Sequence, residues 1–140
     1  MGKIICATRG GEISRSTEDR AIELAQERGD ELIFLYVVDI SFLDTIAHEV
    51  VVDIEGGIEK MGDFLLAMAQ ERAAAQGVEA RAIHRRGQVR HEIKAAILEE
   101  KADTLVMGRP AGEEAVFAQR GISPFAERMA AETGVEVVLV

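Results

Sequence analysis

The segment from Glu31 to Val38, Glu-Leu-Ile-Phe-Leu-Tyr-Val-Val, constrains the fold most, because it is apolar almost throughout and rich in branched and aromatic residues. A strand that faces water on one side alternates polar and apolar residues, whereas a continuous apolar run suits a parallel strand covered on both faces. Shorter runs of strand character lie at Lys3 to Thr8, Asp103 to Gly108 and Val135 to Val140, and Glu79 to Arg85 alternates well enough to predict a further strand.

Helical spacing of apolar residues separates these runs. It predicts helices from Ser14 or Ser16 to Gly29, from Ile58 to Gln76, after Gly87, and from Pro124 to Glu132, with Met61, Met68 and Met129 at core positions. The alternation predicts a parallel α/β sheet with right-handed crossovers and a ligand site at the carboxyl ends of the strands.

The stretch from Asp39 to Gly57 has apolar pieces but no clean period. We interpret it as a long connection, and connections of this length often serve as binding lids or partner contacts.

The composition limits the function classes. A chain of 140 residues with 48% hydrophobic content fits one domain spanning residues 1–140. The net charge of −9 disfavours nucleic acid and anionic membrane surfaces as partners, and no apolar stretch approaches the ~20 residues needed to span a bilayer. A single cysteine, Cys6, and the lack of a signal-peptide pattern predict a reducing, cytoplasmic setting.

A glycine-containing loop follows the strand that ends at Met107. Gly108, Gly112 and Gly121 lie in it, and Ser123-Pro124 begins the next helix. Loops of this kind offer backbone N–H groups to phosphates, although the spacing matches neither the Walker nor the dinucleotide pattern. The alternative is a plain strand-to-helix connection capped by Ser123.

Two arginines follow strands directly: Arg9 after the first and Arg109 after the fourth. If those strands are neighbours, their guanidinium groups converge on one crevice, with Arg120 as a third, and favour a small anionic ligand. The alternative is a pair of solvated arginines beside Glu12, Glu113 or Glu114.

The sequence gives little support for metal or nucleophilic chemistry. His48, His84 and His91 lack the spacing of metal ligands, and no Gly-x-Ser-x-Gly motif is present. Cys6 lies inside a strand and reads as an inert core thiol.

Four segments together resemble the universal stress protein family: Lys3-Ile-Ile-Cys-Ala-Thr8, Leu35-Tyr-Val-Val-Asp39, Ala102-Asp-Thr-Leu-Val-Met-Gly-Arg109, and Phe125-Ala-Glu-Arg-Met129 followed by Val135 to Val140. The resemblance covers the whole chain. It implies a Rossmann-like, adenine nucleotide alpha hydrolase-like fold, in which helices sandwich a five-stranded parallel sheet of order 3-2-1-4-5. It also implies a homodimer joined through the C-terminal strand Val135 to Val140, and a ligand such as ATP with Mg or an AMP-like or cyclic nucleotide.

The chain departs from the ATP-binding pattern of that family. Arg9 stands where those members have an acidic residue, Gly112 comes one place late, and Gly121-Ile-Ser123 replaces their Gly-Ser pair, whereas Gly108 and Val38 carry over. The resemblance therefore implies weak or altered nucleotide binding. The candidate ligand-binding residues are Thr8, Arg9, Val38, Gly108, Arg109, Gly112, Gly121 and Ser123.

We expect a stress-response binding or regulatory module without turnover as its main role and without a catalytic residue. One alternative is slow ATP hydrolysis with magnesium held by Glu113 or Glu114. The other is a structural dimeric interaction domain that binds no ligand.

Overall fold

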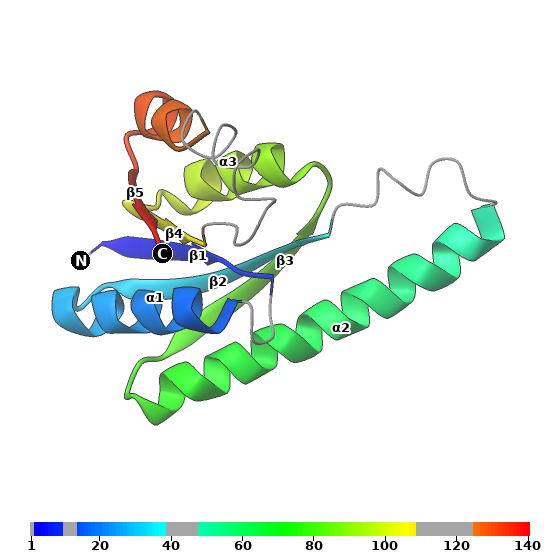
Figure 1. Cartoon of the computed structure of the whole chain (residues 1–140), viewed down its shortest axis with the longest axis horizontal. Coiled ribbons are helices and arrows are strands. Elements are labelled where there is room, and N and C mark those ends of the chain that lie inside the picture. Colours follow the sequence, from blue (N-terminus) through cyan, green and yellow to red (C-terminus); the bar gives the residue numbers. More distant parts are fainter. Residues whose placement is uncertain (1, 10–13, 39–47, 109–124) are drawn as a thin grey trace.

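The computed structural model describes residues 2–9, 14–38, 48–108 and 125–140. Its strands are β1 (Lys3–Ala7), β2 (Glu31–Val38), β3 (Ala80–Arg86), β4 (Thr104–Met107) and β5 (Glu136–Leu139), and its helices are α1 (Arg15–Arg28), α2 (His48–Ala75), α3 (Val89–Glu100) and a helix over residues 125–133. Figure 1 shows the strands as one twisted sheet between two helical layers.

The sheet has the order β3-β2-β1-β4-β5, and every neighbouring pair is parallel. This confirms the strand order that the family resemblance implied. The fold is a Rossmann-like α/β fold with β1 at the centre and β3 and β5 at the edges.

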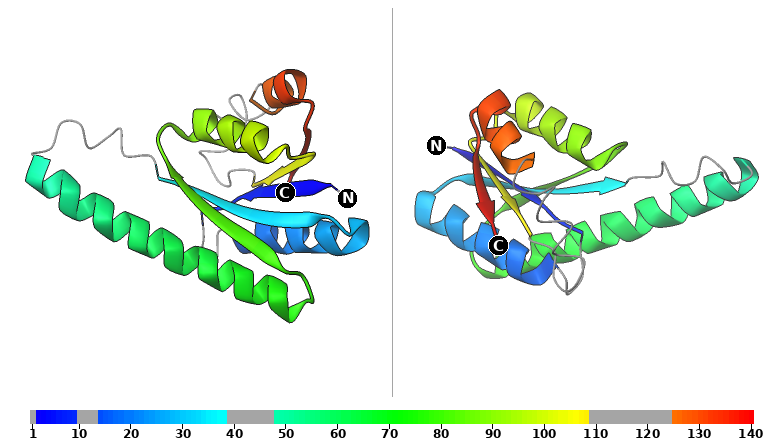
Figure 2. Two further views of the ribbon diagram at one scale, coloured as in Figure 1. Left: turned by 180° about the vertical axis from the view of Figure 1, so that it is seen from behind. Right: turned by 45° about the horizontal axis from the view of Figure 1, so that its top comes forward.

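Both faces of the sheet are covered, as the apolar run of β2 predicted. Leu32 and Phe34 of β2 point toward α1 and α2, whereas Ile33 and Leu35 point toward α3 and the helix over residues 125–133. All four side chains are at most 1% exposed. Successive strand residues point to opposite faces, so a strand between two helical layers needs apolar residues at every position. The two views in Figure 2 show the same layers from behind and from above.

Helix α2 starts earlier than the sequence predicted. Residues 48–57 are helical, so the interpretation of Asp39 to Gly57 as one long connection was wrong for that part, and residues 39–47 lie outside the described part. Apolar and charged residues mix along residues 48–57, and this hid the helical period.

The core face of α2 also differs from the prediction. Leu66, Ala69 and Ala73 pack on the sheet, whereas Met61 is 53% exposed and Met68 is 45% exposed, so placing these two methionines in the core was wrong. The small residues face inward because the helix approaches the sheet closely: a Cβ at Gly62 would lie 2.8 Å from two ring carbons of Tyr36. Met129, in contrast, is buried at 3% exposure, as predicted.

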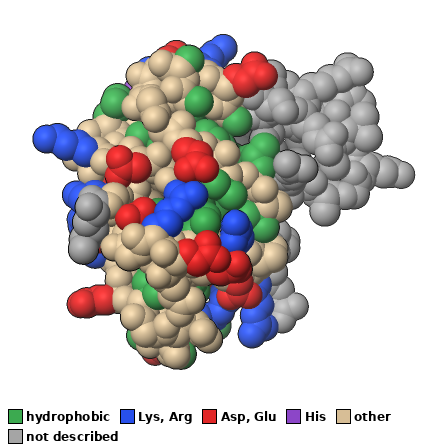
Figure 3. Space-filling view, turned by 90° about the vertical axis from the view of Figure 1, so that its left-hand side faces the viewer, with side chains coloured by type: hydrophobic (Ala, Val, Ile, Leu, Met, Phe, Trp, Pro, Cys, Tyr) green, Lys and Arg blue, Asp and Glu red, His purple; other side chains and the backbone are tan. Residues whose placement is uncertain are grey.

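The amino ends of the strands carry mixed charge, which Figure 3 shows as interspersed acidic and basic side chains. Lys3 and Arg81 both pair with Glu31 and Glu100 there. The paired Arg81 guanidinium lowers the pKa of Glu100, chiefly through its hydrogen bond. The candidate site lies at the other end of the sheet, at the carboxyl ends of the strands.

Within the described residues, no helix is both long and apolar enough to cross a membrane.

Candidate functional site at the carboxyl ends of β1 and β4

The strand order reverses between β1 and β4, so the carboxyl ends of these two strands flank the crevice where such sheets bind ligands. Ala7 pairs with Met107 at the end of the two strands. Thr8 and Gly108 therefore leave the sheet as neighbours, as predicted for two strands that meet at the site.

Thr8 is buried, and its hydroxyl donates a 2.5 Å hydrogen bond to Oε2 of Glu18 on α1. Its backbone N–H donates to the carbonyl of Leu35 at 2.9 Å. These two bonds fix the residue at the end of the central strand. They also place a carboxylate directly behind the candidate site.

Glu18 is only 3% exposed, and its other oxygen, Oε1, accepts a 2.5 Å ion-pair hydrogen bond from Nη1 of Arg72 on α2. A buried carboxylate without a partner would be strongly unfavourable, so Arg72 compensates this charge. The chain Thr8, Glu18, Arg72 thus links the central strand to both helices on this face of the sheet.

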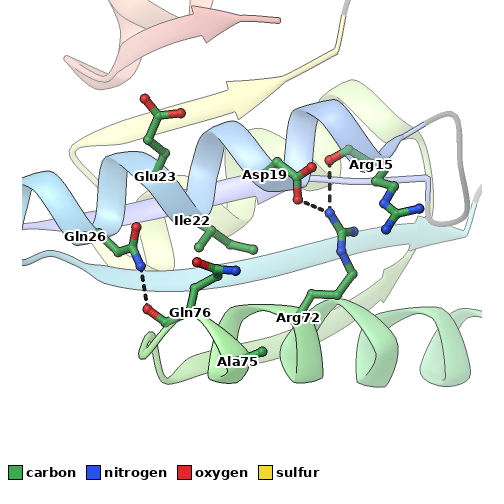
Figure 4. A pocket seen from close by; sticks show the side chains of 8 residues that line it. All are labelled: Arg15, Asp19, Ile22, Glu23, Gln26, Arg72, Ala75 and Gln76. Atoms are coloured by element: carbon green, nitrogen blue, oxygen red, sulfur yellow. Dashed lines mark hydrogen bonds and ion pairs between the residues drawn. The ribbon is translucent and has the colours of Figure 1, made fainter.

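Arg72 makes two more contacts with α1. Its Nη2 binds the carboxylate of Asp19 and donates to the carbonyl of Arg15 at 3.3 Å. Figure 4 shows Arg72 reaching across the groove between the two helices toward both groups. At the far end of the groove, the side chain of Gln26 donates to the carbonyl of Gln76. The acidic residues of the first turns of α1 are therefore already engaged.

Arg9 follows Thr8 and is exposed. Its backbone N–H donates to Oγ of Ser14 at 2.8 Å. Ser14, one of the two predicted candidates, is the N-cap residue of α1, but its side chain makes no capping bond and accepts from Arg9 instead. The guanidinium of Arg9 has no ion-pair partner among the residues that the structure describes.

Gly108 has a packing role that the sequence did not predict. A Cβ at this position would lie 2.9 Å from Oγ1 of Thr17 in the first turn of α1. Glycine therefore lets the end of β4 pass close to the start of α1. This contact brings the carboxyl end of β4 and the helix N-terminus together at one place.

Val38 ends β2 and is buried, and its carbonyl accepts a 2.9 Å hydrogen bond from the N–H of Gly87. A carbonyl oxygen has two lone pairs, so this one can accept a second hydrogen bond. Gly87 has a φ of +147°, and a Cβ there would meet the carboxylate of Glu92 at 2.9 Å. A side chain at residue 87 would therefore disturb the support of Val38.

Four of the candidate residues, Arg109, Gly112, Gly121 and Ser123, lie outside the described part of the chain, as do Arg120, Glu113 and Glu114. In the described part, no group of three His, Cys, Asp or Glu side chains is arranged to hold a metal ion. Cys6 is fully buried in β1, and burial raises the pKa of its thiol, which keeps it protonated and unreactive.

Sequence reasoning missed Glu18 and Arg72 as parts of the site. A signal was present for Glu18, because it shares one helical stripe with Ala21, Ile22 and Ala25 on the buried face of α1. A charged residue on such a stripe needs a buried partner. The identity of that partner, 54 residues away, was not readable from the spacing.

Comparison with known protein families shows the family of this chain. The model of the universal stress protein family matches residues 1–140. The chain belongs to the universal stress protein family. A curated member, Universal stress protein YxiE of Bacillus subtilis (strain 168), is 31% identical over 137 residues, which cover 92% of this chain and 86% of that protein.

Solved universal stress proteins share the fold at low identity. Universal stress protein UspA from Lactobacillus plantarum is 17% identical with a TM-score of 0.79, and the match covers 99% of this chain and 97% of that chain. A universal stress protein in complex with cAMP is 22% identical with a TM-score of 0.71, covering 99% and 96%. These structures establish the arrangement of elements around the crevice of the family.

Proposed function

We propose that this universal stress protein is a cytoplasmic binding or regulatory module that takes a nucleotide or a smaller anion at the carboxyl ends of β1 and β4. A single observation carries the proposal. Arg9 is exposed at this edge without an ion-pair partner in the described part of the chain, while the buried Glu18 directly behind it is compensated by Arg72. The exposed guanidinium of Arg9 therefore favours an anionic ligand at this edge.

The same arrangement favours a ligand with one phosphate over a magnesium-bound polyphosphate. Magnesium is held by carboxylates, and Glu18 and Asp19, acidic residues near this edge, are engaged by Arg72. A guanidinium such as that of Arg9 can bind one phosphate group through two parallel hydrogen bonds. The structural neighbour solved with cAMP supports a nucleotide with a single phosphate as ligand class.

The base and sugar of such a nucleotide would meet Val38 and Gly108. The carbonyl of Val38 would accept a second hydrogen bond from an amino group, and Gly108 would line the site with its backbone at the end of β4. Arg109, Gly112, Gly121 and Ser123 complete the proposed site through the loop that follows β4.

Calorimetric titration tests the proposal with AMP, cAMP and magnesium ATP as separate ligands. We expect AMP or cAMP to bind more tightly than magnesium ATP. Arg9→Ala should weaken that binding at least about tenfold, which is about 1.4 kcal/mol, and the double variant with Arg109→Ala should abolish it. Arg20→Ala is the control, because Arg20 is an arginine of α1 that pairs with Glu23. Equal affinity of the Arg9→Ala variant and the unaltered protein would exclude this site.

We also propose that the chain forms a homodimer through its last strand. β5 is an edge strand with half-buried apolar residues, and an open edge of this kind pairs readily with another strand. The N–H groups of Glu136 and Val140 donate to β4, so strand alternation directs those of Val137 and Leu139 toward the open edge. Leu139→Pro removes one outward donor and should weaken this dimer in sedimentation equilibrium, with Val138→Thr, which keeps every backbone donor, as the control.

A further inference from the structure

The outer face of α2 carries a stripe of large apolar side chains that nothing in the described part of the chain covers. Met61, Phe64 and Met68 are 53%, 65% and 45% exposed, and their spacing of three and four residues puts them on one side of the helix. We call these three residues the α2 stripe. Single exposed apolar residues are common on protein surfaces, but a contiguous row of them marks an interaction surface.

The helix cannot roll to bury this stripe, because contacts hold both of its flanks. On one flank, Asp63 pairs with Nδ1 of His84 at 2.9 Å and Gln70 donates to the carbonyl of Ala80 at 2.9 Å, both on β3. On the other flank, Arg72 binds α1 through Glu18 and Asp19. The sheet and α1 therefore fix the direction in which the α2 stripe points, which is away from the sheet.

The stripe is complementary to itself in one orientation. Met61 and Met68 are equidistant from the midpoint between Phe64 and Leu65. When two copies of α2 run antiparallel with a twofold axis at that midpoint, Met61 packs against Met68 of the partner subunit, and the two Phe64 side chains meet at the centre. An interface of this kind is isologous, as in most homodimers.

The charges beside the stripe fit the same orientation. Lys60 and Glu71 are eleven residues apart, which is close to three turns, so they share one flank of the stripe. Both are exposed, and neither has an ion-pair partner within the described residues. In the antiparallel pair, Lys60 lies within two residues, about 3 Å along the axis, of the position opposite Glu71 of the partner subunit. Symmetry produces this pair of opposite charges twice.

We infer that a second copy of this chain docks on the α2 stripe and forms an antiparallel helix pair separate from the proposed β5 interface. Three large side chains per copy make a small interface, below the roughly 1,200 Å² of buried surface at which specific, stable complexes begin. The association is therefore weak and depends on concentration. Together, the α2 and β5 contacts join copies into tetramers or longer assemblies.

Charge exchange at Lys60 and Glu71 tests the inference. Lys60→Glu and Glu71→Lys each replace two opposite-charge pairs by two like-charge pairs, and each should weaken self-association about tenfold. The double variant restores opposite charges and should recover the association of the unaltered chain. Glu127→Lys, an exposed change on the opposite side of the sheet, serves as the control and should have no effect.

Sedimentation velocity over a range of concentrations gives the readout, both in the unaltered chain and in the Leu139→Pro background, where the β5 interface is weakened. Phe64→Asp should abolish the α2-dependent association, and circular dichroism should show that each variant keeps its helices. Recovery in the double charge exchange supports pairing between copies. A Leu139→Pro protein that stays monomeric at every concentration, or a double variant as weak as the single ones, would overturn the inference.

Discussion

Arg72 of α2 donates to the buried carboxylate of Glu18 on α1 at 2.5 Å, across 54 residues of sequence. The same carboxylate accepts the hydroxyl of Thr8 through its other oxygen. The position of Thr8, the residue before Arg9, is therefore coupled to the packing of α2. One polar network therefore joins the proposed ligand site to the helix that carries the α2 stripe.

Breaking this ion pair from either side should destabilise the fold. Arg72→Met or Glu18→Gln leaves a buried group without its partner, and we expect each to lower the free energy of unfolding by about 3 kcal/mol. The double variant should cost less than the sum, because the two residues interact. Urea denaturation measures all three, with Arg20→Met as control for an exposed pair worth under about 1 kcal/mol. An Arg72→Met cost no larger than the control would contradict a structural role of the pair.

Gly108→Ala tests the close approach of β4 and α1. The new Cβ would lie 2.9 Å from Oγ1 of Thr17, and we expect a loss of about 1 to 3 kcal/mol in unfolding free energy. Thr17→Ala removes that oxygen atom. In the Thr17→Ala background, Gly108→Ala should therefore cost much less, and equal costs in both backgrounds would exclude the contact.

Two glycines of α2 should respond to substitution by alanine with opposite changes in stability. A Cβ at Gly62 would meet the ring of Tyr36 at 2.8 Å, so Gly62→Ala should destabilise the protein by about 1 to 3 kcal/mol. A Cβ at Gly57 has open space around it, and alanine has the higher helix propensity, so Gly57→Ala should stabilise by up to about 1 kcal/mol. Thermal denaturation of the two variants distinguishes the signs. A stabilising Gly62→Ala would contradict the close packing of α2 on β2.

Acid should remove the contribution of the Arg81–Glu100 pair. The pKa of Glu100 is lowered in the folded protein, chiefly by the hydrogen bond from Arg81. A lowered folded pKa gives stability that is fully present above the unfolded value of 4.5 and is lost as the pH falls through the folded value. Glu100→Gln should therefore cost stability near neutral pH and almost none in strong acid. In an Arg81→Gln background this pH dependence should shrink to the smaller part that Lys3 contributes, and an unchanged pH dependence would contradict Arg81 as the main partner of Glu100.

The sequence was sufficient for the fold because its strongest patterns are local. The apolar run of β2 required helices on both faces, and the structure gives that strand the predicted bounds, Glu31–Val38. The prediction of the buried face of α2 was wrong for a local reason as well, because this helix has two candidate apolar stripes. The larger side chains of Met61 and Met68 suggested the wrong stripe, whereas the stripe of Gly62, Leu66, Ala69 and Ala73 packs on the sheet, with Gly62 against Tyr36.

The candidate site also has a part that the sequence could predict and a part that it could not. Thr8 and Gly108 could be placed beside each other from the strand order alone, because the ends of neighbouring parallel strands meet. The pairing of Glu18 with Arg72 depends on how α1 and α2 lie side by side, and that arrangement has no trace in the spacing of either helix. The exposure of Arg9 next to a residue bonded to the compensated carboxylate of Glu18 was likewise not readable from the sequence.

The most direct test of the proposed site is a titration of ¹⁵N-labelled protein with AMP, followed by amide chemical shifts. We predict that the amides of Thr8, Arg9, Val38 and Gly108 shift together and saturate, while those of Lys3, Glu31 and Asp103 at the opposite edge stay unchanged. Shifts confined to the opposite edge, or no shifts at millimolar AMP, would contradict a nucleotide site at the carboxyl ends of β1 and β4.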